Sequence, residues 1–188
     1  MRRSSMLVAL AALLALSVVF ELLPKVRAPW GMSIDFVAVP ILIAFFVFGF
    51  KEALALSAGL WVLLCIMGFG SFIGGTMKVM ATLPMFAIPA ILAHLMKRRE
   101  VIFSLWFTAI AFPLALLVRC AVTVVLNYYW AIPLFFGEPI EVLIEKFFFG
   151  SIWGFIWFVS AMNITQGVVD YLIGLAVSSR IVKLKILE

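Results

Sequence analysis

The chain has 188 residues and a formal net charge of +5, with 66% hydrophobic and only 12% charged residues. Soluble domains contain about 45–50% apolar and about 25% charged residues, so this composition excludes a water-soluble globular domain and indicates a bilayer-embedded protein. The basic residues gather at the edges of apolar segments, which argues against nucleic-acid binding, and the length fits a single transmembrane domain over residues 1–188.

The first apolar segment, at about 6–23, follows a basic start and therefore resembles a signal peptide. The stretch 26–28 also mimics a cleavage site. Glu21 and Lys25 interrupt this pattern, however, and Pro29 directly follows the mimic. We therefore expect this segment to be retained as the first transmembrane helix.

Small residues recur along the first helix, where Ala11 and Ala15 stand four positions apart. Such spacing lets a second helix approach closely. The alanine patch predicts either tight packing within the same bundle or contact with a partner protein.

The first loop, LPKVRAPWGMSIDF (23–36), combines Trp30 and Asp35 with two prolines. Trp30 could cap a cavity or anchor the chain at the membrane interface. For Asp35 we expect a role as the N-cap of the second helix.

Five further apolar segments follow, at about 34–50, 53–69, 77–96, 102–126 and 147–178. A membrane-spanning helix needs about 20 apolar residues, so the second segment is short. The run 102–136 is too long for one helix, and Pro133 and Gly137 predict that it ends in an irregular connection. An acidic outer loop is expected at 137–146.

The distribution of basic residues predicts the topology. With the N-terminus inside, nine basic residues fall on the inner side: Arg2, Arg3, Lys51, Lys97, Arg98, Arg99, Arg180, Lys183 and Lys185. Three fall outside: Lys25, Arg27 and Lys146. The positive-inside rule then predicts an all-α integral membrane protein with six transmembrane helices and both termini cytoplasmic.

Polar residues occupy the predicted fourth and fifth helices. Lys78 either snorkels to the outer interface or reaches a ligand. Arg119 and Asn127 stand eight residues apart on one helix face. Arg119 could pair with Asp170 or Glu21, or it could bind an anionic group.

The last helix carries a polar stripe at i, i+3, i+4 and i+7: Asn163, Gln166, Gly167 and Asp170. Extended backwards, the stripe reaches Ser160, Trp157 and Trp153. It predicts a cavity wall on which indoles stack a flat ring while amides pair with the ring's edge. The alternative is that these polar groups only hydrogen-bond helix to helix.

The sequence gives little indication of a catalytic site or a metal site. Cys65 and Cys120 lie in apolar segments and read as buried apolar side chains. His94 has no second ligand at metal-binding spacing, and the sequence contains neither a Walker motif nor a catalytic triad. We expect no enzyme, no metal and no bound cofactor, so any use of ATP must come from a partner chain.

Four stretches together resemble the substrate-binding S components of energy-coupling factor (ECF) vitamin transporters, which are six-helix membrane subunits of about this length. They are FELLPKVRAPWGMSIDFVAVPILIAFFVFG (20–49), GGTMKVMATLPMF (74–86), LNYYWAIPLFF (126–136) and MNITQG (162–167). The likeness covers nearly the whole chain and is greatest to the riboflavin-specific type.

This resemblance implies a high-affinity riboflavin site near the extracellular side, covered by the first loop, in a multi-pass cell-membrane protein. It implies hydrogen bonds to the flavin from Asn127 and Asn163. The other expected site residues are Lys78, Asp35, Trp30, Tyr128, Gln166 and Gly167. Ala11 and Ala15 match the patch that docks the ECF transmembrane coupling subunit, and two cytosolic ATPases would be separate chains.

Two positions depart from the riboflavin pattern. Gln166 replaces the usual Lys, and Lys78 stands where Asn is common. Either the positive charge has moved between helices, or the ligand is another vitamin or a precursor. A membrane enzyme using Arg119, Asp170 or Glu21, and a ligand-free scaffold subunit, are the competing hypotheses.

Overall fold

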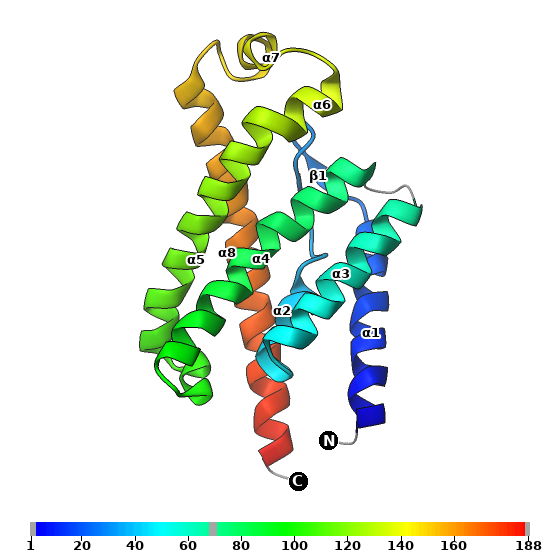
Figure 1. Ribbon diagram of the computed structural model, residues 1–188, viewed down its shortest axis with the longest axis vertical. Helices are drawn as coiled ribbons and strands as arrows, with labels where there is room; N and C mark the ends of the chain where they lie inside the picture. The colour runs from blue at the N-terminus through cyan, green and yellow to red at the C-terminus, as the bar shows by residue number, and fades with distance from the viewer. Residues whose placement is uncertain (1–2, 68–70, 187–188) are drawn as a thin grey trace.

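The computed structural model describes residues 3–67 and 71–186, which form an elongated helical bundle (Figure 1). The long elements are α1 (Arg3–Leu22), α2 (Val39–Val47), α3 (Phe50–Met67), α4 (Ser71–Leu95), α5 (Leu105–Leu126) and α8 (Ile152–Ile186). The short elements are β1 (Val26–Arg27), β2 (Ser33–Ile34), η1 (Arg99–Phe103), η2 (Asn127–Ala131), α6 (Ile132–Phe136) and α7 (Ile140–Phe147). Each of the six predicted apolar segments overlaps one of the long helices.

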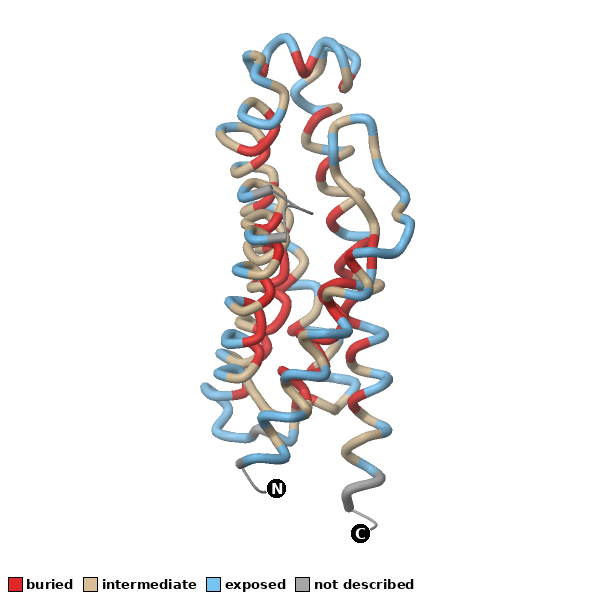
Figure 2. Tube along the Cα trace, turned by 90° about the vertical axis from the view of Figure 1, so that its right-hand side faces the viewer, coloured by how far each residue is buried: buried red, intermediate tan, exposed pale blue. Residues whose placement is uncertain are grey.

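Within the described residues, four helical stretches are long and apolar enough to cross a membrane: Ser4–Leu22, Phe72–Leu95, Leu105–Phe136 and Ile152–Lys183. The described ends of α1 and α8 lie at the same end of the bundle, opposite α7 and the β1–β2 hairpin (Figure 1). Buried residues face the inside of the bundle and exposed ones face outward (Figure 2). The chain is therefore an all-helical membrane protein, apart from one small hairpin.

The short helix α2 forms the centre of the core. Its nine residues span about 14 Å at 1.5 Å per residue, less than half of a hydrocarbon layer about 30 Å thick. Leu42 and Phe45 are buried against α8 and α4. At Gly174 of α8, a Cβ atom would lie only 2.8 Å from the Cβ of Leu42, so the close approach of the two helices requires glycine. Because α2 is short, the chain that precedes it, residues 23–38, is non-helical and contains only the strands β1 and β2.

That segment includes the β1–β2 hairpin, in which Val26 pairs with Ile34 and Arg27 with Ser33. The backbone N–H of Ala28 donates to the carbonyl of Met32 at 2.8 Å and closes the turn. The hairpin lies in the predicted first loop, and its strand β2 packs against α8.

The predicted irregular connection within 102–136 is wrong, because the chain stays helical from Leu105 to Phe136. One π turn, η2, interrupts the α geometry, and the N–H of Ile132 donates to the carbonyl of Asn127, five residues back. A wider turn relieves the clash between Pro133 and the carbonyl four residues before it. The helix ends at Gly137, whose φ of +68° is left-handed.

The predicted outer loop 137–146 is largely helical as well. Its helix α7 buries Ile140, Leu143 and Ile144 against the top of the bundle. These three apolar positions, spaced i, i+3 and i+4, form one helix face.

Candidate ligand-binding site

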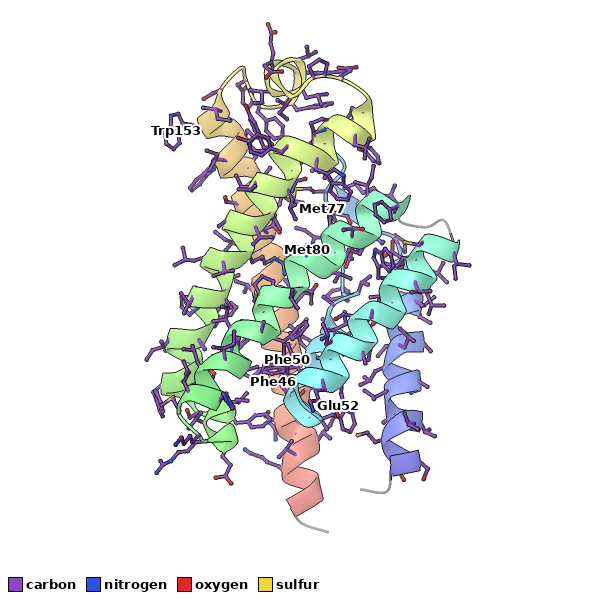
Figure 3. All side chains as sticks on the ribbon, viewed as in Figure 1. Phe46, Phe50, Glu52, Met77, Met80 and Trp153 are labelled. Carbon is purple, nitrogen blue, oxygen red and sulfur yellow. The ribbon has the colours of Figure 1, made fainter. Side chains whose placement is uncertain are left out.

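A cavity of about 180 Å³ lies among the first loop, α4, α5, η2, α6 and α8. These elements meet in the half of the bundle nearer α7 (Figure 1). Its apolar walls include Ile41, Met77, Ile132, Phe135 and Met162. Met77, on α4, is labelled in Figure 3. The polar lining consists of Trp30, Ser33, Asp35, Lys78, Thr82, Arg119, Thr123, Asn127, Asn163, Gln166 and Asp170. Six of the eight predicted binding residues are among these.

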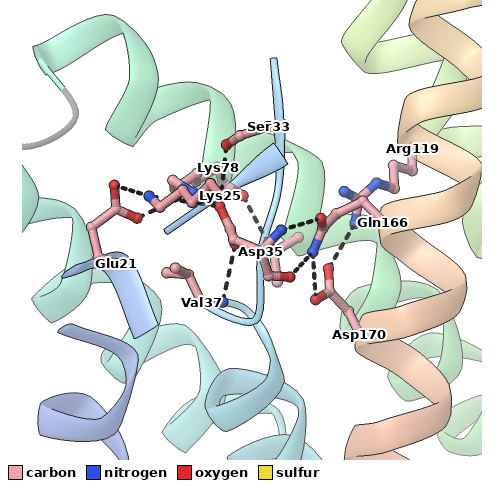
Figure 4. A network of polar contacts seen from close by, with 10 residues as sticks. Glu21, Lys25, Ser33, Asp35, Val37, Lys78, Arg119, Gln166 and Asp170 are labelled. Atoms are coloured by element: carbon pink, nitrogen blue, oxygen red, sulfur yellow. Dashed lines mark hydrogen bonds and ion pairs between the residues drawn. The ribbon is translucent and has the colours of Figure 1, made fainter. Parts of the chain in front are cut away.

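Asp35 is the centre of a buried polar network (Figure 4). Its carboxylate pairs with the ammonium group of Lys78 and accepts a hydrogen bond from the backbone N–H of Val37 at 3.0 Å. Lys25 lies 3.9 Å away. The predicted capping role is wrong, because the N-cap of α2 is Ala38 and no side chain caps it. The lysines that attract this carboxylate are distant in sequence or in another element, so a local pattern does not reveal them.

Gln166 fastens this loop to α8. Its side-chain amide donates to the backbone carbonyl of Asp35 at 2.6 Å and accepts from the backbone N–H of Asp35 at 2.9 Å. The same amide nitrogen donates to Asp170 at 2.8 Å. Both N–H groups of Gln166 are thus used within the protein, and they fix the floor of the cavity.

A second buried pair joins α5 to α8. The guanidinium Nη1 of Arg119 lies 3.6 Å from Oδ2 of Asp170, and Nε of Arg119 donates to Oδ1 of Asn163 at 3.3 Å. Arg119 is 3% exposed and Asp170 is 0% exposed. Of the roles considered for Arg119, the structure shows pairing with Asp170. Nη1 of Arg119 and Oδ2 of Asp170 face each other in this ion pair, just beyond hydrogen-bond distance, and both atoms are buried.

The charges around the cavity balance. Its lining holds two carboxylates, Asp35 and Asp170, and two cations, Lys78 and Arg119. Beside them, Glu21 pairs with Lys25 and lies 3.3 Å from Lys78. Since isolated buried charges are costly, this pairing explains how six ionisable side chains are tolerated here. The cavity therefore presents no net charge to a ligand.

Asn127 and Asn163 line the same cavity from α5–η2 and α8, as the sequence predicts. Each is buried and donates one amide hydrogen to the carbonyl four residues earlier: Asn127 to Thr123 at 2.8 Å, and Asn163 to Val159 at 2.9 Å. An amide has two donor hydrogens. One hydrogen of each amide is therefore not used by these bonds.

Trp30 lines the cavity from the first loop. Its ring packs against Phe148 and Phe158, at centroid distances of 5.1 and 5.6 Å, and its indole N–H is buried without a partner. Trp30 is therefore part of the cavity wall rather than an anchor at the surface of the bundle.

Two predicted binding residues do not line the cavity. Tyr128 packs against Phe155 at 5.7 Å. Gly167 is a helix-packing position, where a Cβ atom would lie 2.5 Å from Leu116 and 3.5 Å from Cδ of Arg119. Its lack of a side chain lets α5 and α8 approach closely enough for Arg119 to reach Asn163.

The predicted stacking by Trp153 and Trp157 is wrong, because these side chains are 76% and 71% exposed. Figure 3 shows Trp153 on the outside of the bundle. Each backward step of three residues falls about 60° short of a full helical turn. Two such steps from Asn163 therefore carry the stripe about 120° away from the cavity.

Ala11 and Ala15 lie on an exposed face of α1. These two alanines therefore do not pack tightly inside the described bundle, and contact with a partner protein stays a prediction. In the described residues no group of three or more His, Cys, Asp or Glu side chains is arranged to hold a metal ion.

No protein-family model matches the sequence, and no curated protein matches it. Among solved structures, one described as "Structure and mechanism of the S component of a bacterial ECF transporter" is similar, with a TM-score of 0.73. The two share 18% sequence identity over 97% of this chain and 98% of that chain. The chain therefore has the fold of an ECF-transporter S component along nearly its entire length.

Proposed function

We propose that this protein is the substrate-binding S component of an ECF-type, ATP-driven vitamin importer, and that riboflavin is its ligand. The observation that carries the proposal is the polar cavity in a bundle with the S-component fold. Such a role requires binding and release but no bond chemistry, and the fold neighbour is itself a transport protein.

The lining of the cavity favours a neutral, flat, polar ligand. Its paired carboxylates and cations supply no net charge for a charged vitamin. Asn127 and Asn163 can each donate to and accept from the edge of a heterocycle. Arg119 and Asp170 line the same cavity as a mutual ion pair, so they add polarity without net charge. An isoalloxazine ring, with alternating donors and acceptors along one edge, suits this arrangement.

The volume of the cavity restricts how such a ligand binds. At about 180 Å³ it is smaller than the roughly 300–1,000 Å³ typical of drug-sized ligands. The ring system would occupy the cavity, and the sugar-alcohol chain would extend towards the mouth beside Lys78 and the first loop. Binding would then displace part of this loop, which Gln166 and the lysines hold in place.

The two departures from the riboflavin pattern meet at one residue. Lys78 brings its ammonium group to the carboxylate of Asp35, while Gln166 holds the backbone of Asp35. A positive charge is thus retained at this point but comes from α4 instead of α8. This supports the hypothesis that the charge has moved between helices and weakens the argument for a different vitamin.

The proposed assembly follows from the exposed alanines and the charge bias. With six crossings of the membrane and cytoplasmic termini, the cavity would open to the outside, as import requires. The exposed face containing Ala11 and Ala15 would dock the ECF transmembrane coupling subunit. Two cytosolic ATPase chains would supply the energy.

The test is a titration of the detergent-purified protein with riboflavin, followed by flavin fluorescence. We expect quenching that saturates at one riboflavin per chain. Flavin mononucleotide should bind more weakly, because its phosphate adds charge to a balanced cavity. Absence of quenching at micromolar riboflavin would exclude this ligand, and a screen of other vitamins would follow. Failure of every vitamin tested would contradict the binding role itself.

A further inference from the structure

A second cleft, of about 750 Å³, lies at the opposite end of the bundle from the cavity lined by Asn127 and Asn163, which we call the vitamin cavity. It is formed where the α2–α3 turn faces the end of α4 and the start of η1. Figure 3 shows Phe50 and Glu52, which line it, in the half of the molecule nearer the termini. We call it the basic cleft, and its lining is Phe45, Phe48, Gly49, Phe50, Lys51, Glu52, Ala90, Ala93, His94, Lys97, Arg98 and Ile102.

Cations converge on this cleft from both of its sides. Lys51 stands in the first turn of α3, whereas Lys97 and Arg98 follow the end of α4, and all three side chains are exposed. None of them forms an ion pair with a carboxylate of the described residues. Glu52 is the one acidic residue in the lining that the structure describes. With three cations against one carboxylate, the described lining of the cleft carries a net positive charge.

The start of α3 adds to this charge. The turn at Gly49, with a φ of +128°, reverses the chain, and the first bond into the helix runs from Ala53 N–H to the carbonyl of Gly49. The N–H groups that precede Ala53 in the helix have no acceptor within it. They give the helix end a partial positive charge directed at the cleft.

The floor of the basic cleft is apolar. Phe45, Ala93 and Ile102 are buried beneath the cations. Next to the cleft, Ile91 and Leu95 are 54% and 71% exposed on the outer face of α4. A molecule held here would meet cations at its head and an apolar helix surface along its body. This combination matches a membrane lipid, whereas free phosphate uses only the cationic part.

We propose that the basic cleft binds the phosphodiester headgroup of an anionic membrane lipid. The lipid's phosphate would lie between Lys51 and Arg98, and its acyl chains would follow the exposed face of α4. The positive-inside bias accounts for basic residues at this end of the helices. This bias does not account for the convergence of basic residues from two separate elements on one cleft. Basic pockets between transmembrane helices are known to bind anionic lipid headgroups.

The experiment uses the full-length protein in detergent, with lipids added and bound lipids counted by native mass spectrometry. The wild type should retain phosphatidylglycerol in preference to phosphatidylcholine. Replacing Lys51→Gln and Arg98→Gln together should weaken phosphatidylglycerol binding by about tenfold or more, because each cation contributes roughly fivefold. The swap Lys51→Arg with Arg98→Lys keeps both charges and should retain binding.

The matched control is Arg180→Gln with Lys183→Gln. It removes the same charge from exposed residues near the end of α8, outside the basic cleft. Equal losses in both double variants would show general surface attraction and overturn the proposal, as would a wild type without preference for phosphatidylglycerol. Displacement of the lipid by 1 mM inorganic phosphate would identify a free-phosphate site instead. Riboflavin titration of each variant reports separately on the vitamin cavity.

Discussion

Replacing Asp170 with alanine is expected to leave the guanidinium of Arg119 as an unpaired charge inside the bundle. Both side chains are almost fully buried, at 0% and 3% exposure, and their charged atoms lie 3.6 Å apart. Removing one partner of such a pair costs about 3–5 kcal/mol, because the remaining charge stays desolvated. We therefore expect Asp170→Ala to lower the free energy of unfolding by about that amount.

The assay is reversible unfolding of the purified protein in mixed micelles, followed by circular dichroism. The double variant Asp170→Leu with Arg119→Met should recover most of the lost stability, since no buried charge remains. The exposed pair Lys146–Glu138 has the same separation, 3.6 Å, so Glu138→Ala is a matched control that should cost only about 0–1 kcal/mol. Equal effects of Asp170→Ala and Glu138→Ala would refute the reasoning.

Three further predictions test other parts of the structure. Gln166→Ala removes two hydrogen bonds to Asp35, so amide exchange should accelerate in the first loop while that of α3 stays unchanged. Gly174→Ala places a methyl group 2.8 Å from the Cβ of Leu42; overpacking should lower stability by about 1–3 kcal/mol, measured by thermal unfolding, and an unchanged transition would contradict the close α2–α8 contact. Ala15→Leu changes an exposed position, so riboflavin affinity should persist while co-purification with the coupling subunit falls; equal co-purification would contradict docking at this face.

Helical periodicity was sufficient to bring part of the site together. Asn163, Gln166 and Asp170 share the inner face of α8, because positions three, four or seven residues apart stay on one face. Asn127 meets them from η2, which follows α5. The same reasoning failed over longer stretches. By Trp157 the accumulated rotation had carried the stripe to the outside of the bundle.

Partners that are distant in the sequence could not be predicted from local patterns. The role of Asp35 depends on Lys78 and Gln166, which lie 43 and 131 residues away. A capping prediction considers only the next few residues, so it could not include them. The helix α7, in contrast, could have been predicted from the sequence. The spacing of Ile140, Leu143 and Ile144 indicates one apolar helix face, but the acidic residues around them were interpreted as a loop.

The central claim is that the cavity lined by Asn127 and Asn163 binds the vitamin. The most direct measurement compares riboflavin affinity for Asn163→Ala with that for Thr165→Ala, an exposed control two residues away on the same helix. Loss of a buried hydrogen-bond partner costs about 1–3 kcal/mol, so Asn163→Ala should bind roughly 5- to 150-fold more weakly. The Thr165 variant should bind like the wild type. Equal affinities of the two folded variants would contradict the claim.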